Sequence, residues 1–178
     1  MSALPLVDPT TATGPVADLL AAVQHGMGVT PNMTKAMANS AALLKGYLDL
    51  SGALGNGVLH PATREQIALA VAQDNACSYC LSAHSYLAEH VAHLSTEDIT
   101  AARKSSAADP KTAAVLAFAT AVNGTRGSIT AADLATVRAA GVTDEEIAET
   151  IGHVALNVLT NYFNKAADVN IDFPVVAA

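Results

Sequence analysis

Two cysteines three residues apart are the side chains of this sequence best suited to chemistry. Cys77 and Cys80 are the only cysteines among 178 residues, and they form the motif Cys-Ser-Tyr-Cys. Two thiols at this spacing can pass between a dithiol and a disulfide within one helical turn. In the chain-entropy model, a disulfide that closes so short a loop stabilises a fold by only about 2 kcal/mol, against about 4.7 kcal/mol for a loop near 100 residues. The spacing therefore favours a redox centre over a structural cross-link.

A histidine follows the cysteine pair at helical spacing. His84 comes four residues after Cys80, so the two side chains would be neighbours on one helix face, with Cβ atoms about 5–6 Å apart. A free thiol with a pKa near 8.5 is only a few per cent thiolate at neutral pH. The positive end of the helix dipole would lower the pKa of Cys77, and His84 can accept a thiol proton directly or through water.

Glu65 and Tyr79 are further candidates for the same site. Glu65 lies in the helix expected before the pair, and a tight turn over 74–76 would aim its carboxylate at the dithiol. There it could orient the imidazole or shuttle a proton, although it could instead complement the dipole of its own helix. Tyr79 could donate a hydrogen bond to a thiolate or to a bound substrate, or simply pack as an aromatic.

A polar stripe follows near the C-terminus, where His153, Asn157, Asn161 and Asn164 recur at helical spacing. These side chains could line the substrate pocket, bond across a subunit contact, or form the solvent edge of an amphipathic helix. We take His153 as a weak candidate for substrate binding.

A metal site is the main alternative use of the cysteines. Cys77, Cys80 and His84 offer three soft ligands, with His90 and His93 nearby. A closed zinc site needs four ligands, however, and on a straight helix the later histidines point away from His84. We expect no bound metal and no cofactor, and two thiols buried by chance remain a further alternative.

Composition limits the partners of the chain. Its 9 Lys+Arg against 16 Asp+Glu give a net charge of −7 without a basic run, which argues against nucleic acid and anionic membranes. Hydrophobic residues make up 51% and charged residues only 14% of the sequence, against about 25% charged in an average domain. We therefore expect a subunit that buries part of its surface against copies of itself.

Helix signals recur along the whole sequence, and no alternating strand pattern competes with them. We expect a poorly ordered segment over 1–14, a single all-α domain over 15–168 and an extended tail over 169–178. One helix should run unbroken from Pro31 to a glycine-rich turn over 51–57. Helix starts are predicted at Pro15, Thr30-Pro31, Pro61, Cys77, Ser95, Asp109, Thr130 and Thr143.

The expected location is the cytoplasm. The N-terminal residues lack the basic and long apolar regions of a signal peptide, and no stretch approaches 18 uninterrupted apolar residues. Inside the cell, a Cys-x-x-Cys pair is more often catalytic or metal-binding than structural.

Together, Glu65, Cys77-Ser-Tyr-Cys80 and His84 resemble the alkylhydroperoxidase D-like (AhpD-like) group of the carboxymuconolactone decarboxylase superfamily. The spacing Glu-x11-Cys-x2-Cys-x3-His is more specific than a lone Cys-x-x-Cys, and the match covers residues 65–84. The resemblance implies an all-α helical bundle that forms a homotrimer or a hexamer, with the dithiol near the subunit contact. It also implies thiol-dependent reduction of hydroperoxides.

The resemblance also implies a role for each site residue. Cys80 would attack the peroxide oxygen and become a sulfenic acid, and Cys77 would condense with it to a disulfide. His84 and Glu65 would form a water-bridged proton relay, and a dithiol reductant, a lipoyl- or thioredoxin-like protein, would restore the pair. The helix-dipole argument instead favours Cys77 as the more acidic thiol. The best-studied branch of the group has a second histidine where this chain has Tyr79, which implies a shorter relay and weaker activity.

An antioxidant thiol peroxidase is therefore the leading hypothesis, and two alternatives stay open. One is a lyase of the kind that gives the superfamily its name, although those decarboxylases typically lack the cysteine pair. The other is a disulfide-relay or redox-sensing protein, which would exchange rapidly with protein thiols and react poorly with peroxides.

Overall fold

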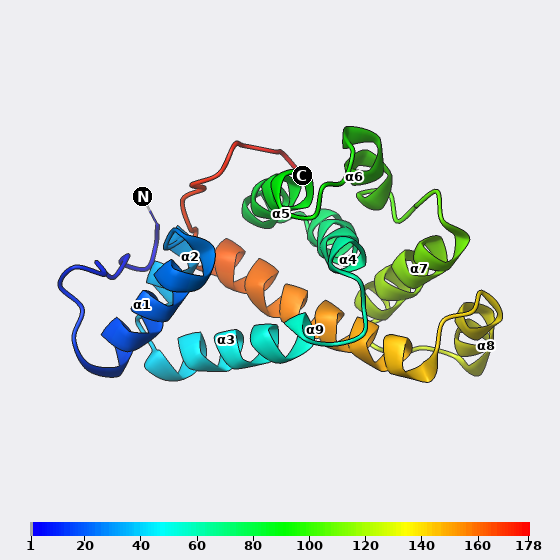
Figure 1. The fold of residues 1–178 in the computed structure, drawn as a ribbon, viewed down its shortest axis with the longest axis horizontal. Coiled ribbons are helices and arrows are strands. Elements are labelled where there is room, and N and C mark those ends of the chain that lie inside the picture. Colours follow the sequence, from blue (N-terminus) through cyan, green and yellow to red (C-terminus); the bar gives the residue numbers. More distant parts are fainter. Residues whose placement is uncertain (1) are drawn as a thin grey trace.

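All regular structure in the computed structural model, which describes residues 2–178, is α-helical (Figure 1). The prediction of an all-α, single-domain fold is confirmed. Met1 belongs to the segment 1–14 that is expected to be poorly ordered, and it lies outside the described residues. The helices are α1 (Gly14–Met27), α2 (Asn32–Met37), α3 (Ala41–Gly55), α4 (Pro61–Asp74), α5 (Ser78–His90), α6 (Thr96–Ala102), α7 (Pro110–Gly124), α8 (Ala131–Ala139) and α9 (Asp144–Ala166).

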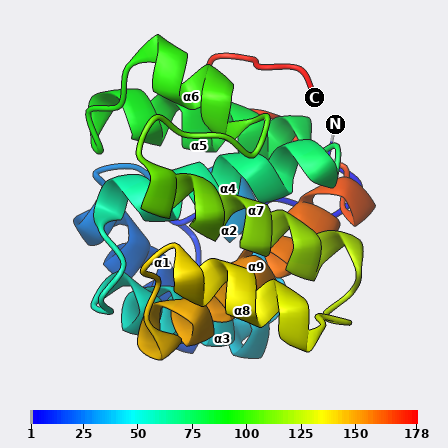
Figure 2. The ribbon, with the colours of Figure 1, turned by 90° about the vertical axis from the view of Figure 1, so that its right-hand side faces the viewer.

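Helix α4 forms the centre of the core. Every residue from Gln66 to Ala72 is buried, and the helix packs against α5, α7 and α9. Figure 2 shows α4 and α7 between α5 and α9. This middle part of α4 has no charged side chain, so it is buried on all sides, and its alanines let the neighbouring helices approach closely. The core therefore provides a fixed support for the ends of α4 and the start of α5.

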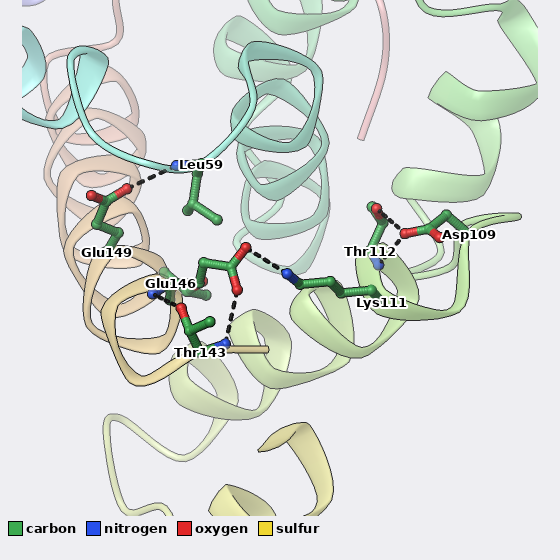
Figure 3. Close-up of polar contacts among 8 residues, drawn as sticks. Leu59, Asp109, Lys111, Thr112, Thr143, Glu146 and Glu149 are labelled. Carbon is green, nitrogen blue, oxygen red and sulfur yellow. Dashed lines mark hydrogen bonds and ion pairs between the residues drawn. The ribbon is translucent and has the colours of Figure 1, made fainter. Parts of the chain in front are cut away.

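Helix α9 is the longest, and polar contacts fix its first turns (Figure 3). Thr143 caps the helix, since its Oγ1 accepts from the Glu146 N–H at 3.2 Å while the Glu146 carboxylate accepts from the Thr143 N–H at 2.8 Å. The same carboxylate pairs with Lys111 of α7 at 2.8 Å. One turn later, Glu149 accepts from the Leu59 N–H at 3.0 Å. These contacts connect α9 to α7 and to the segment before α4.

The helix predicted to run unbroken from Pro31 is two helices, α2 and α3. Ser40 interrupts it, because the Ser40 side chain accepts from the Leu43 N–H at 3.3 Å and starts α3 as its N-cap. The Asn39 side chain also bonds to the Ala36 carbonyl at 2.8 Å. Side chains that bond to nearby backbone in this way compete with helix continuation. Helix α3 then extends to Gly55, into the segment expected to be a turn.

The tail after α9 is extended and lies across α5, where Figure 1 draws it in red. The backbone N–H of Val176 donates to Ser82 Oγ of α5 at 2.9 Å. The ring of Phe173 packs edge-on against Tyr79, with the ring centroids 6.0 Å apart. Residues from the end of the chain therefore reach the start of α5. No helix within residues 2–178 has the length and apolar character needed to cross a membrane.

We predict that Gly57→Ala lowers the free energy of unfolding by about 1–3 kcal/mol. A Cβ at this position would occupy the space of the Glu149 carboxylate, which also accepts from the Val58 N–H at 2.8 Å. Displacing this carboxylate leaves the two backbone donors at 58 and 59 unpaired. Urea unfolding followed by circular dichroism measures the change.

The matched control is Gly52→Ala in the exposed part of α3. A Cβ there meets nothing within 4 Å, so the better helix propensity of alanine should stabilise the protein by about 0.5–1 kcal/mol. Gly57→Ala and Gly52→Ala proteins of equal stability would contradict the role given to Glu149.

Candidate active site

The two cysteines lie at the start of α5, directly after a tight turn. Helix α4 ends at Asp74, and Ala76 has a left-handed backbone conformation with φ at +50°. The chain reverses there, so that α5 packs back against α4. Cys77 then occupies the N-cap position of α5, where its Sγ accepts from the backbone N–H of Cys80 at 3.3 Å.

The sulfur atoms of Cys77 and Cys80 are in contact. They lie 2.8 Å apart, and both thiols are free and buried. One thiol must donate its proton to the other sulfur. Because Cys77 Sγ already accepts the Cys80 N–H, it holds negative charge better, and the shared proton stays on Cys80.

This contact separates the acidities of the two thiols. The hydrogen bond from the Cys80 side chain lowers the pKa of Cys77 to about 7 against the effect of burial, helped by the Cys80 N–H, His84 and Lys165. The same hydrogen bond, burial and the charge on Cys77 all raise the pKa of Cys80. The two groups titrate as one system, which releases its first proton near neutral pH.

His84 and Glu65 form a pair beside the dithiol. The His84 Nδ1 and Glu65 Oε2 atoms are 2.8 Å apart, and the side chains are 24% and 22% exposed. Burial alone would lower the pKa of His84, but the charge of the Glu65 carboxylate and its hydrogen bond outweigh burial and raise that pKa above its usual range. The imidazole can therefore hold a proton near neutral pH and release it within the site.

Two asparagines of α9 face Cys80. The Asn164 side chain is buried, and its Nδ2 is 3.3 Å from Cys80 Sγ and 3.3 Å from Met33 Sδ. Asn161 is also buried, and its Oδ1 accepts from Asn75 at 3.0 Å. Both amides act to lower the pKa of Cys80, against the larger effect of Cys77. The polar stripe on α9 therefore faces inward and is not a solvent edge.

A mostly apolar cavity of about 60 Å³ opens beside Cys80. Of the two cysteines, Cys80 lines its wall and Cys77 does not. The wall is formed by Met27, Pro31, Met33, Thr34, Tyr47, Tyr79, Cys80, Ala83, His84, Leu87, Thr160, Asn164 and Phe173. A molecule with an apolar body and a small polar head fits such a wall, and Cys80, His84 and Asn164 are the groups that its head would meet.

The Tyr79 ring lines this cavity, but its hydroxyl is engaged away from the thiols. The hydroxyl donates to Asp172 Oδ1 of the tail at 2.8 Å and accepts from the Met33 N–H at 3.0 Å. Burial and the nearby Asp172 carboxylate raise the pKa of Tyr79 well above its usual range. In this structure Tyr79 therefore holds the tail and α2 against the start of α5.

A second, polar cavity of about 140 Å³ lies between α3, α4, α5 and α9. Its wall is formed by Tyr47, Ser51, Gly55, Arg64, Glu65, Ala68, His84, His153, Leu156, Asn157 and Thr160. His153 is buried, and its Nε2 has no partner among the described residues. Burial and the charge of Arg64 lower its pKa, so its imidazole is neutral near pH 7. His84 belongs to both cavities and separates Glu65 from the Cys80 side.

The structure brings the dithiol, His84 and Glu65 into one site, and it places Tyr79 in the wall of the same site. His153 faces the second cavity. Over residues 2–178, no group of three or more His, Cys, Asp or Glu side chains is arranged to hold a metal ion.

Solved structures share this fold. An uncharacterized peroxidase-related protein with an alkylhydroperoxidase AhpD core, from Ralstonia eutropha JMP134, has a TM-score of 0.85 over 96% of this chain and 92% of that chain, at 22% identity. An uncharacterized peroxidase-related protein from Silicibacter sp. TM1040 has a TM-score of 0.81 over 94% and 88%, at 23% identity. A variant of the debrominase Bmp8 in complex with 2,3,4-tribromopyrrole has a TM-score of 0.75 over 88% and 85%, at 19% identity.

The sequence also matches a family model. Residues 41–124, which include Glu65, both cysteines and His84, match the carboxymuconolactone decarboxylase family. The chain therefore shares its fold with AhpD-type structures and the site-bearing part of its sequence with the carboxymuconolactone decarboxylase family. The resemblance found in the motif is thereby confirmed. No curated protein matches the sequence.

Several residues of this AhpD-like site were not singled out from the sequence. Asn161 and Asn164 were only part of a polar stripe, and helical spacing cannot say which face of a helix turns inward. Asp172 and Phe173 gave no signal, because the course of an extended tail is set by tertiary contacts. Of these missed residues, the asparagines alone gave a signal in the sequence, which was their recurrence at helical spacing on a long helix.

We predict that Glu65→Gln brings the pKa of His84 below the ordinary histidine value of about 6.5. Without the carboxylate, burial disfavours the charged form of the imidazole, and of the effects that raise its pKa the charge of Cys77 remains. NMR titration of the His84 ring measures the change, and an unchanged titration would contradict this account of the pair.

The pair should also affect stability with a defined pH dependence. The pKa of His84 is higher in the folded than in the unfolded state. The pair therefore stabilises the fold fully when the pH is below the unfolded-state pKa, and this stabilisation is lost as the pH rises through the folded-state pKa. The stability lost in Glu65→Gln should therefore be largest between about pH 5 and 6.5 and shrink above that range.

Proposed function

We propose that this chain is a thiol-dependent peroxidase with an antioxidant role, which reduces hydroperoxides through a dithiol–disulfide cycle of Cys77 and Cys80. The observation that carries the proposal is the 2.8 Å contact between the two sulfurs, beside the His84–Glu65 pair. The match of residues 41–124 to the carboxymuconolactone decarboxylase family supports it, as does the fold shared with structures described as peroxidase-related.

Cys80 is the proposed nucleophile, because its sulfur lines the apolar cavity. In the resting pair the negative charge lies on Cys77 and the proton on Cys80. Transfer of that proton across the 2.8 Å contact gives a Cys80 thiolate and a Cys77 thiol. In this proposal Cys77 is the thiol that loses its proton first, as the helix-dipole argument expects, and its thiolate then accepts the proton of the attacking Cys80.

The Cys80 thiolate then attacks the outer oxygen of the hydroperoxide. The O–O bond breaks, an S–O bond forms, and the sulfur loses two electrons to the peroxide. Protonated His84 gives its proton to the departing alkoxide, so the products are an alcohol and a Cys80 sulfenic acid. Glu65 keeps His84 charged until this step.

The Cys77 thiol then attacks the sulfenic acid. A disulfide forms, and the hydroxyl group leaves with the thiol proton as water. A dithiol partner, a lipoyl- or thioredoxin-like protein, would attack the disulfide as a thiolate and return two electrons by thiol–disulfide exchange. The polar cavity gives the His84–Glu65 pair a route for regaining its proton.

Assembly into a homotrimer or a hexamer is part of this proposal. Ile151 and Tyr162 of α9 and Leu50 of α3 are exposed apolar side chains on helices that a subunit contact could cover. Light scattering coupled to size-exclusion chromatography measures the subunit number, and a monomer at micromolar concentration would contradict this part of the proposal.

A second candidate reaction is reductive removal of a halogen from an aromatic ring. A protein of the same fold is called a debrominase and was crystallised with 2,3,4-tribromopyrrole. The aromatic side chains of Tyr47, Tyr79 and Phe173 in the cavity wall would suit a flat ring. The dithiol would supply two electrons and two protons, which give the dehalogenated ring, hydrogen bromide and the Cys77–Cys80 disulfide.

We predict that Cys77→Ser and Cys80→Ser each abolish turnover of tert-butyl hydroperoxide with a dithiol donor, because neither variant can form the disulfide. Only Cys77→Ser should still form a sulfenic acid, which dimedone traps at Cys80. His84→Ala should slow turnover severely. Wild-type rates in either cysteine variant would overturn the mechanism and favour acid–base chemistry by Glu65 and His84, as in the lyase alternative.

Mass spectrometry after one equivalent of peroxide tests the same cycle without a reductant. The reduced protein should lose two hydrogens and yield a peptide linked through Cys77 and Cys80. A protein that instead forms this disulfide rapidly with oxidised protein thiols, and slowly with peroxide, would be a disulfide relay or redox sensor.

A further inference from the structure

Two unpaired polar atoms lie beside Cys80, on asparagines that the proposed mechanism has not used. Asn164 Oδ1 and Asn161 Nδ2 are buried, and neither has a hydrogen-bond partner among residues 2–178. The Asn164 side chain is only 3% exposed and lines the apolar cavity, and Asn161 is fully buried. Buried polar atoms of this kind are rare in folded proteins and call for an explanation.

The orientation of the Asn164 amide follows from its sulfur neighbours. Its nitrogen is 3.3 Å from both Cys80 Sγ and Met33 Sδ, and sulfur accepts hydrogen bonds from N–H groups. The opposite orientation would place a carbonyl oxygen against a sulfur that becomes negatively charged. The nitrogen therefore faces the sulfurs, and the oxygen is the end of the amide that is left without a partner.

Asn161 is held in the complementary way. Its oxygen accepts from Asn75 Nδ2 at 3.0 Å, and Asn75 also bonds Asn123 of α7, with Nδ2 and Oδ1 at 3.3 Å. These contacts fix the oxygen of Asn161 toward the α4–α5 turn. Its amide nitrogen is therefore free to stabilise negative charge on Cys80. The unpaired donor of Asn161 and the unpaired acceptor of Asn164 therefore both belong to amides that act on Cys80.

A hydroperoxide is chemically complementary to this arrangement. Its terminal O–H is a hydrogen-bond donor, and the oxygen that carries this hydrogen is the atom that Cys80 attacks. If the O–H donates to Asn164 Oδ1, the same amide holds the Cys80 thiolate through Nδ2 and the reacting oxygen through Oδ1. Holding both reactants in one geometry accelerates a reaction by removing the need for a chance encounter.

We propose that Asn164 is the residue that binds and orients the hydroperoxide group against Cys80, while Asn161 and Asn164 together stabilise the thiolate. This inference rests on the proposed peroxidase function and specifies the substrate as a molecule with a free O–O–H end. After attack, the sulfenic acid on Cys80 carries the former peroxide hydroxyl, which can keep its hydrogen bond to Asn164 Oδ1. Cys77 then displaces that hydroxyl as water, and no further reactant is needed.

The test compares two reactions of Cys80 in a Cys77→Ser protein, where Cys80 is the one remaining thiol. Oxidation by tert-butyl hydroperoxide needs the thiolate and an oriented O–H, whereas alkylation by iodoacetamide needs the thiolate alone. Asn164→Leu keeps the approximate shape and removes both ends of the amide. We expect alkylation at neutral pH to slow about ten-fold and oxidation to slow about ten-fold more than alkylation.

Asn164→Asp is the second variant, in case the leucine variant does not fold. Its carboxylate keeps the acceptor oxygen but repels the thiolate, so alkylation and oxidation should slow by the same factor and the pH profile of alkylation should shift upward. Asn170→Leu is the matched control, because Asn170 is exposed and lies in the tail. Both of its rates should equal those of the Cys77→Ser parent.

The outcomes separate this inference from the proposed function. Equal slowing of oxidation and alkylation in Asn164→Leu, or no slowing of either reaction, would overturn the orienting role. A parent protein whose Cys80 reacts with the hydroperoxide no faster than a free thiolate would overturn the peroxidase function itself. A larger loss of oxidation than of alkylation, confined to Asn164→Leu, is the result that the proposal requires.

Discussion

The contact between the Cys77 and Cys80 sulfurs is the interaction on which the rest of this site depends. The hydrogen bond between the two sulfurs, which lie 2.8 Å apart, lowers the pKa of Cys77 and, together with burial, raises the pKa of Cys80. The contact exists because the α4–α5 turn places Cys77 at the N-cap and Cys80 in the first turn of α5. A dithiol held in this way can become a disulfide with little movement of the backbone.

The surrounding fold places an acid–base pair, His84 and Glu65, and a substrate-sized cavity beside the dithiol. The middle of helix α4 is buried, and just before it Glu65 pairs with His84, which lines both cavities. One cavity is mostly apolar and reaches Cys80, whereas the other has a more polar wall and reaches Glu65. Chemistry at the sulfurs and proton exchange at the carboxylate can therefore take place on different sides of one imidazole.

Much of this architecture could be predicted from the sequence, because local signals determine it. The caps at Ser95, Asp109, Thr130 and Thr143 start helices where expected, since side-chain oxygens accept from the first backbone N–H groups. The prediction of an unbroken helix after Pro31 was wrong, because a serine such as Ser40 fits a helix interior as well as a cap, and the sequence does not distinguish the two. The roles of Asn164 and Phe173 could not be found, since both depend on contacts between distant segments.

The most direct test of the account is a pH titration of the reduced protein, followed by the ultraviolet absorbance of the thiolate. The account predicts that one thiolate per chain appears with a midpoint near pH 7, and that the second appears only above the ordinary range of cysteine. Replacing Cys80 with alanine should return Cys77 toward an ordinary thiol pKa. Two thiolates that appear together, near the ordinary cysteine pKa of about 8.5, would contradict the shared proton.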